Sequence, residues 1–479
     1  MELDPDYITE NLSEFGIKGG LTLLRELINS SNSPSIRKRA LENFGRIDDK
    51  KNFKFFEQLF LSDEDSNIQL IAGCILRENY STSKKILRLL EYALRNIDNI
   101  EQKIFSIKTL NSINSSNSHK VLGEFLKDFV KEVPKNSINE FPKEIYSLSI
   151  KNPIPEGLIN ICINLILYNY YLNQCRYLPS LRKGEIFSLI CESSNLNSIT
   201  EIAGLSNLYS LEHLSLQRNH IKKIRLFPSL KKLKSLTISY NLLEKIENLE
   251  WLENLEELNL SNNKIMKIEN LNSLTKLKKL SIDGNLITII ENLDSLRELE
   301  ALNLSQNLIS EMNNLGKLGK LKRINLSFNQ IRKIADLKRL KELMWIYLTN
   351  NKISKIEGLI TLDKLRGLYL SNNLIERIES LDNLINLRKL ELSHNNIKNL
   401  NGISNLKELK ELYLDNNNIN ELKGLDKLKK LIILHIGRNN IIKYRSESIK
   451  NLNNLNFLFL NENPLDQESW EQYKKRFRF

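Results

Sequence analysis

The segment L-E-E-L-N-L-S-N-N-K-I-M-K-I, residues 255–268, decides the fold of this 479-residue chain. Leu258 and Leu260 alternate with polar residues, which is the period of a strand with one buried face. Asn263 follows where such a strand ends, and two isoleucines continue the apolar pattern beyond it. One copy of this segment is too short to bury its own apolar face, so neighbouring copies have to stack on it.

The same pattern, L-x-x-L-x-L-x-x-N-x-I-x-x-I, recurs at a fixed interval along the second part of the chain. Eleven of its asparagines are spaced by 22 residues, and a further one, Asn463, follows after 24. The regular series is Asn219, Asn241, Asn263, Asn285, Asn307, Asn329, Asn351, Asn373, Asn395, Asn417 and Asn439. Each copy therefore predicts one short strand of a parallel sheet.

The asparagine has a physical role in such a stack. Its amide both donates and accepts hydrogen bonds, so it can satisfy backbone groups of neighbouring turns at the point where the chain leaves the strand. The repeat predicts an asparagine ladder through a continuous apolar core.

Residues 186–479 resemble the 22-residue class of leucine-rich repeats that is shared by a regulatory subunit of protein phosphatase-1 and by the internalins. This resemblance implies an α/β solenoid with a parallel concave sheet. Within residues 181–479 we expect a degenerate first repeat at 186–210, regular repeats at 211–454, and a terminal repeat with a C-terminal cap at 455–479. Regulation of a phosphoprotein phosphatase is implied by family analogy alone, because unrelated functions share this fold.

Both ends of the array depart from the consensus. At the first repeat Ser194 occupies the ladder position, and three residues are inserted before Leu211. At the C-terminus Trp470, Tyr473 and Phe477 follow at helical spacing, which resembles the terminal cap of such arrays. A cap of this kind covers the open edge of the sheet.

Residues 1–180 have a helical period instead. The segment 36–41 recurs 32 residues later at 68–73, and a weaker copy begins near Lys103. This resembles HEAT-like helical repeats, so we expect an N-terminal all-α domain at 1–180. It acts either as a cap of the solenoid or as a second binding surface.

Residues between the strand leucines point away from the core, which predicts the surface that a partner contacts. One column of this surface changes from small polar to aromatic residues midway along the array. It reads Ser215, Thr237, Asn259, Ser281, Asn303, Asn325, Tyr347, Tyr369, Glu391, Tyr413, His435 and Phe459. Neighbouring columns add the aromatic residues Phe328, Trp345, His394 and Phe457 and the basic residues Arg323, Arg366, Arg388, Lys389 and Arg438.

Aromatic residues together with arginine are typical of interface hot spots. We therefore predict a protein-binding site made of Arg323, Trp345, Tyr347, Arg366, Tyr369, Lys389, Tyr413, His435 and Arg438. The alternative is that tyrosine and phenylalanine are present only as good strand formers, or that Phe457 and Phe459 pack on the cap.

The charge of the chain is uneven. Residues 1–180 hold 23 basic and 23 acidic residues, so the remainder supplies the whole net charge of +12. Lys234, Lys278, Lys279 and Lys322 are expected near the concave strands. Nucleic-acid binding on this basic surface is a second hypothesis, although no recognised nucleic-acid motif accompanies it.

Other function classes lack their signatures. The sequence contains no phosphate-binding glycine loop, no His-Glu-x-x-His motif and no nucleophile elbow, so we expect no enzyme and no cofactor. The four cysteines and five histidines are too scattered for a metal site. The acidic N-terminus and the lack of a long apolar run predict a cytoplasmic, monomeric protein that does not cross a membrane.

Overall fold

The computed structural model describes residues 3–48, 50–132 and 156–476. The chain forms two compact units. The first comprises Met1–Phe187 and Ile202–Leu208, and the second comprises Ser188–Glu201 and Tyr209–Phe479. Strand β2, Glu185–Ile190, contains the division between them.

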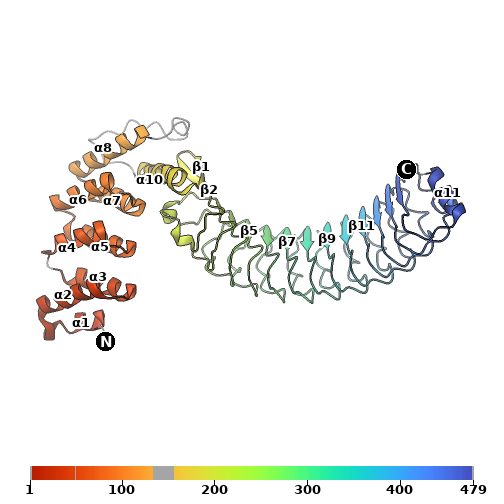
Figure 1. Cartoon of the computed structure of the whole chain (residues 1–479), viewed down its shortest axis with the longest axis horizontal. Coiled ribbons are helices and arrows are strands. Elements are labelled where there is room, and N and C mark those ends of the chain that lie inside the picture. The colour runs from red at the N-terminus through yellow and green to blue at the C-terminus, as the bar shows by residue number, and fades with distance from the viewer. Residues whose placement is uncertain (1–2, 49, 133–155, 477–479) are drawn as a thin grey trace. The chain divides into compact units, whose positions relative to one another are not determined.

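The first unit consists mainly of antiparallel helix pairs (Figure 1). Its helices are α1 (Pro5–Glu10), α2 (Leu12–Ser30), α3 (Pro34–Ile47), α4 (Phe53–Ser62), α5 (Ser66–Tyr80), α6 (Lys84–Asn96), α7 (Ile100–Ile113), α8 (Ser116–Glu132) and α10 (Glu156–Tyr170). A π-helical turn (Tyr171–Cys175) and strand β1 (Leu178–Arg182) follow. Helix α2 packs on α3, α4 on α5 and α6 on α7, while α3, α5 and α7 also pack on one another in series.

The 32-residue recurrence corresponds to the second helix of successive pairs. Arg37 on α3 and Gln69 on α5 occupy equivalent positions and satisfy carbonyl groups at the end of the preceding helix. The Arg37 Nε donates to the Ile28 oxygen at 2.7 Å, and the Gln69 Nε2 donates to the Asp63 oxygen at 2.6 Å. These bonds close helix ends whose carbonyls have no partner inside the helix. The relation to HEAT repeats stays a prediction.

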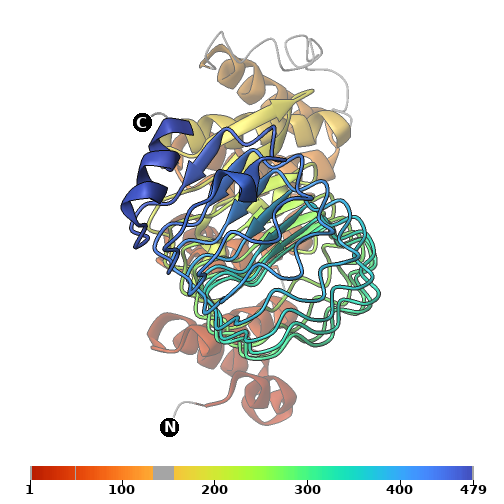
Figure 2. The ribbon, with the colours of Figure 1, turned by 90° about the vertical axis from the view of Figure 1, so that its right-hand side faces the viewer.

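The second unit is a solenoid whose short parallel strands line its concave side (Figure 1). They are β3 (His213–Ser215), β4 (Ser235–Thr237), β5 (Glu257–Asn259), β6 (Lys279–Ser281), β7 (Ala301–Asn303), β8 (Arg323–Asn325), β9 (Trp345–Tyr347), β10 (Gly367–Tyr369), β11 (Lys389–Glu391), β12 (Glu411–Tyr413), β13 (Ile433–His435) and β14 (Phe457–Phe459). The strands follow one another in chain order. Figure 2 looks along the solenoid from its C-terminal end and shows successive turns stacked on one another. The prediction of an α/β solenoid that follows an N-terminal helical region in the sequence is confirmed.

The asparagine ladder forms as predicted. In the turn that contains β6, the Asn285 Nδ2 donates to the Leu260 oxygen of the preceding turn at 3.1 Å and to the Ile282 oxygen of its own turn at 3.1 Å. The Asn285 Oδ1 accepts from the Ile265 N–H at 3.0 Å. Each ladder asparagine thus satisfies backbone groups that water cannot reach, which fixes the spacing of the turns.

Both ends of the array differ from its middle. At the first turn the Ser194 hydroxyl donates to the Glu192 oxygen within the same turn at 3.1 Å, so the ladder begins at Asn219. At the C-terminus helix α11, Gln467–Arg476, packs on the last turn, and the Tyr473 hydroxyl donates to the Leu458 oxygen at 2.8 Å. The predicted Phe477 of this cap lies outside the described residues.

Candidate functional site

The aromatic residues of strands β9 to β14 lie in one row across the concave sheet. The register pairs Tyr347 with Tyr369, Tyr369 with Glu391, and Glu391 with Tyr413. His435 and Phe459 continue the row on the next two strands. All of these side chains lie outside the leucine core and are partly exposed, because the alternation of the strand directs them to the solvent face.

The first part of the row is a group of three neighbouring rings, which we call the Trp345 cluster: Trp345, Tyr347 and Tyr369. The Tyr347 and Tyr369 rings are stacked, with centroids 4.4 Å apart and planes inclined by 18°. The Trp345 ring lies 6.5 Å from the Tyr369 ring. Such stacks hold aromatic side chains in fixed orientations and reduce the entropy that binding has to remove.

Gly367 makes room for the Trp345 ring. It occupies the strand position next to Trp345 in the register, and a Cβ atom built on Gly367 would lie 2.3 Å from the Trp345 Cε3. A real Cβ would therefore overlap the indole. The absence of a side chain at Gly367 lets the indole occupy this space.

Lys389 fills the middle of the row and joins its two halves. Its Nζ lies 3.0 Å from the Glu391 Oε1 and 3.3 Å from the Glu411 Oε2. The same atom lies 5.5 Å from the Tyr369 ring centroid and 4.9 Å from the Tyr413 ring centroid. Burial disfavours the ammonium, but the bonds and charges of the two glutamates outweigh it and raise the pKa of Lys389. Lys389 thus connects Glu391 and Glu411, and its own charge is already paired within the chain.

The second part of the row is another stack. The Tyr413 and His435 rings lie 4.8 Å apart, and the His435 and Phe459 rings lie 4.1 Å apart. The His435 Nδ1 lies 3.6 Å from the Asp415 carboxylate. The Tyr413 hydroxyl donates to the Glu411 carboxylate at 3.1 Å. The Tyr413 hydroxyl is therefore satisfied within the chain, and the three side chains remain partly exposed.

Burial also affects the tyrosine hydroxyls of the row. Partial burial, together with the neighbouring Tyr347, raises the pKa of Tyr369 to about 12. Burial and the hydrogen bond to Glu411 raise the pKa of Tyr413 as well. At neutral pH both residues are uncharged hydrogen-bonding aromatics, which suits a binding surface better than a proton-transfer site.

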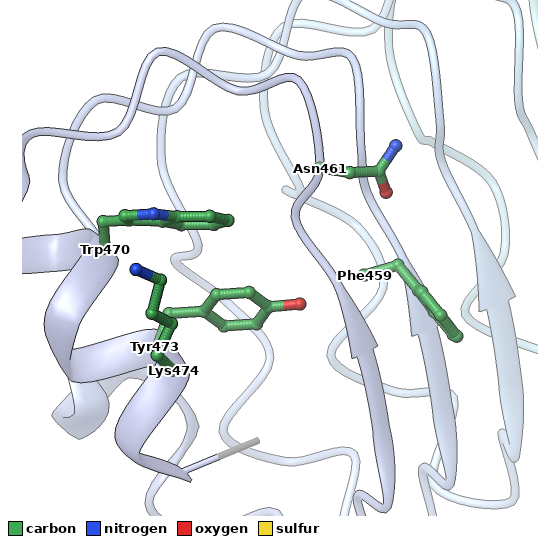
Figure 3. A pocket seen from close by; sticks show the side chains of 5 residues that line it. All are labelled: Phe459, Asn461, Trp470, Tyr473 and Lys474. Carbon is green, nitrogen blue, oxygen red and sulfur yellow. The ribbon is translucent and has the colours of Figure 1, made fainter. Parts of the chain in front are cut away.

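The row ends at a pocket of about 470 Å³ between the last turn and the cap (Figure 3). Phe459 and Asn461 line it from the sheet side, and Trp470, Tyr473 and Lys474 line it from helix α11. The Trp470 and Tyr473 rings are stacked at 5.5 Å. Phe459 lines this pocket, while its ring stacks on His435 of the preceding strand, so its packing on the cap stays a prediction. Phe457, by contrast, is 53% exposed.

The remaining predicted residues surround the row. Arg323 is exposed and pairs in register with Trp345, and Arg366 is exposed directly before β10. Arg438 is also exposed, but its Nε lies 3.0 Å from the Glu462 Oε1. Phe328 and His394 lie at the corner that follows each strand, where the backbone has a positive φ of 57° at both residues.

The lysines predicted near the first half of the sheet are engaged within the chain. Lys234, Lys278 and Lys322 each pair with a glutamate of the preceding turn, at 3.1, 2.8 and 2.8 Å. Lys279 pairs with Glu257 at 2.6 Å. This half of the concave face is consequently less basic than the lysine count indicates.

Three features that contribute to the row were not predicted from the sequence. They are the space that Gly367 provides, the neutralisation of Lys389 by Glu391 and Glu411, and the pocket that includes Asn461 and Lys474. The first two follow from the 22-residue register, since 345 and 367, like 389 and 411, differ by 22. The pocket depends on where α11 folds back, which the repeat does not specify.

Residues 3–48, 50–132 and 156–476 contain no group of three or more metal-ligating side chains. No described helix combines the length and apolar character of a transmembrane span. Cys74, Cys162, Cys175 and Cys191 form no disulfide with one another.

Comparison with known proteins gives the same architecture. Two leucine-rich-repeat family models match, one at residues 209–251, 253–295 and 385–427, and the other at 320–375. No curated protein matches the chain significantly.

Three solved structures resemble the fold. An internalin of Listeria monocytogenes has 24% identity and a TM-score of 0.55, covering 72% of this chain and 90% of its own. A Leptospira interrogans leucine-rich-repeat protein has 26% identity and a TM-score of 0.52, covering 59% and 80%. The LRIM1/APL1C complex gives 20% identity and a TM-score of 0.51, covering 60% and 54%.

Proposed function

We propose, from the premise that this chain is a leucine-rich-repeat protein, that its solenoid is a scaffold that binds a protein partner on the C-terminal half of the concave face. The observation that carries this proposal is the aromatic row from Trp345 to Phe459. Its rings stack in two sets, Tyr347 with Tyr369, and Tyr413 with His435 and Phe459.

The row has the properties of an interface centre. Its rings are already ordered by stacking on one another, so a partner does not have to immobilise them. They are partly buried and partly exposed, and therefore offer apolar area to a partner without unfolding any part of the core. Tyrosine and tryptophan are the residues that most often dominate the binding free energy of interfaces.

The solved relatives support the class of function. One of the structures with this fold is a complex of LRIM1 with APL1C. Fold similarity at this identity supports a binding module in general, and the position of the site in this chain rests on the aromatic row alone.

The proposal is tested with Trp345→Ala, Tyr347→Ala and Tyr369→Ala combined in the full chain. Affinity capture from the source cells, followed by mass spectrometry, compares this variant with the wild type. Proteins bound through the row are expected to decrease at least about tenfold, because a hot-spot side chain contributes about 2 kcal/mol or more.

A matched control replaces Ser235, Thr237 and Ser281 by alanine on the first half of the same sheet. These side chains are also partly exposed. The control variant is expected to retain the wild-type set of proteins. If both variants retain that set, the binding site is not the aromatic row.

A further inference from the structure

The residue directly before each strand forms a column along one edge of the concave sheet, which we call the edge column. In its first half this column alternates in charge: Glu212, Lys234, Glu256, Lys278, Glu300 and Lys322. Each lysine pairs with the glutamate one turn before it, at 2.8 to 3.1 Å. The chain therefore neutralises this half of the edge column by itself.

The second half of the edge column is different. After Met344 it holds three successive cations, Arg366, Arg388 and Lys410, and all three are exposed. Among the residues that the structure describes, no carboxylate lies within salt-bridge distance of any of them. The backbone fixes them on adjacent turns, since the Arg388 N–H donates to the Arg366 oxygen at 2.9 Å and the Lys410 N–H to the Arg388 oxygen at 2.8 Å.

Three like charges on adjacent turns repel one another. Neighbouring turns are about 4.8 Å apart, which is shorter than the screening length of about 8 Å at physiological ionic strength. The charges of Arg388 and Lys410 make only minor contributions to the lowered pKa of Glu408. Its hydrogen bond to Lys430, 2.5 Å long, is the main cause of its lowered pKa. The repulsion is thus not offset by an ion pair within the described chain.

The change in the edge column coincides with the start of the aromatic row. Met344 ends the alternating charges, and Trp345, the next residue, begins the row. The three cations then accompany Tyr369, Lys389 and Tyr413 on the same three turns. A single ligand that lies along the solenoid would therefore contact both the cations and the rings.

We infer that the edge column formed by Arg366, Arg388 and Lys410 binds the carboxylates of an extended acidic segment of the protein partner. This inference rests on the proposed function and specifies the chemistry of the partner. The arginine forks donate paired hydrogen bonds to carboxylates, and the apolar side chains of the segment contact the rings beside them.

The spacing defines the segment. Two steps of the solenoid span about 10 Å, which an extended chain covers in about three residues at about 3.3 Å each. Three carboxylates within about four residues match three cations on adjacent turns. Acidic residues further along the segment would gain no partner from the edge column.

The rest of the face favours a protein segment over nucleic acid. Glu391 and Glu411 share the single cation Lys389, so the centre of the row carries an excess negative charge. A polyanion that covered the whole face would meet this charge. A protein segment places carboxylates only over the edge column and apolar groups over the row.

The test uses the full chain and a display library of random 16-residue peptides. Wild-type protein is expected to enrich sequences in which three of four consecutive residues are Asp or Glu next to an aromatic or aliphatic residue. The variant R366E/R388E/K410E is expected to lose at least about tenfold of the affinity for these peptides, since each exposed ion pair contributes up to about 1 kcal/mol. Circular dichroism checks that each variant is folded.

A matched variant, K355E/R377E/K398E, changes the net charge by the same amount on neighbouring turns. Its residues are exposed and lie outside the strands. This variant is expected to bind the acidic peptides with the affinity of the wild type. Equal loss in both variants would mean that net charge attracts the peptides, and the inference would be wrong.

Further outcomes of these experiments distinguish a failure of the inference from a failure of the proposed function. The enriched peptides could show no excess of acidic residues and yet fail to bind the Trp345, Tyr347 and Tyr369 variant. This result would support the proposed function and overturn the inference. Failure to enrich any peptide would overturn the inference as well, and the capture experiment would then decide the function alone. A single-stranded oligouridine that binds the wild type, and not R366E/R388E/K410E, would identify nucleic acid as the ligand.

Discussion

At the scale of single residues, the candidate site depends on side chains that are small or internally paired as much as on large exposed ones. Gly367 leaves the space in which the Trp345 indole lies. Lys389 pairs with two glutamates between the tyrosines and reduces the repulsion between their carboxylates. The aromatic surface is thus ordered before any partner arrives.

Replacement of Gly367 by alanine is expected to displace the Trp345 ring. The new Cβ would overlap the indole, and overpacking of this kind costs about 1 to 3 kcal/mol when the ring cannot move. Because Trp345 is partly exposed, it can swing outward, so we expect a red-shifted tryptophan emission and a stability loss at the lower end of this range.

Gly319→Ala is the matched control, because no atom lies within 4 Å of a Cβ at Gly319. Its emission spectrum and melting temperature are expected to stay close to those of the wild type. An unchanged emission spectrum in Gly367→Ala would show that the indole does not occupy the space beside Gly367.

At the scale of elements, helix α11 terminates the sheet and forms one wall of the pocket at the end of the row. Tyr473 is 4% exposed and joins the helix to the last strand through its hydroxyl. Ser469 accepts a hydrogen bond from the Tyr444 N–H at 2.8 Å. These contacts cover backbone and leucine side chains that the last turn cannot cover itself.

Tyr473→Ala is expected to loosen the last turns of the solenoid. Removal of a large buried ring lowers the free energy of unfolding by about 3 to 5 kcal/mol. In a repeat protein this effect is concentrated in the turns near the substituted residue. Hydrogen exchange measured by mass spectrometry should show faster exchange in β13 and β14 and unchanged exchange in β4 and β5.

Trp470→Ala serves as a comparison on the same helix. Trp470 is 39% exposed, and its loss is expected to enlarge the pocket with a smaller effect on exchange in β14. Equal acceleration in the two variants, or acceleration that reaches β4, would contradict a local role for the cap.

At the scale of the whole solenoid, the asparagine ladder connects every turn to the next. Asn307 illustrates this, because its Nδ2 donates to the Ile282 oxygen of the preceding turn at 3.0 Å and its Oδ1 accepts from the Ile287 N–H at 3.0 Å. The Ile282 oxygen also accepts from Asn285 of its own turn, so successive ladder asparagines share one carbonyl between them. The ladder therefore couples the unfolding of each turn to that of its neighbours.

Asn307→Ala is expected to lower the free energy of unfolding of the solenoid by about 1 to 3 kcal/mol. The substitution removes the partner of the buried Ile287 N–H, and a buried donor without a partner costs about this much. Urea denaturation followed by circular dichroism measures the change.

Asn313→Ala is the control, because Asn313 is exposed and its side chain donates to the Glu311 carboxylate of the same turn at 2.7 Å. Its effect is expected to stay within about 0.5 kcal/mol. A similar small effect of Asn307→Ala would mean that water replaces the ladder.

The amino-acid sequence by itself determined the solenoid, the ladder and the solvent-facing direction of Trp345, Tyr347 and Tyr369. These features are local, because each follows from a two-residue strand period repeated every 22 residues. The tertiary structure decided how those side chains meet across turns. It brings Lys389 between two glutamates, leaves Arg366, Arg388 and Lys410 without a salt bridge in the described chain, and folds α11 back to form a pocket. Such contacts depend on distances between separate turns, which no single repeat contains.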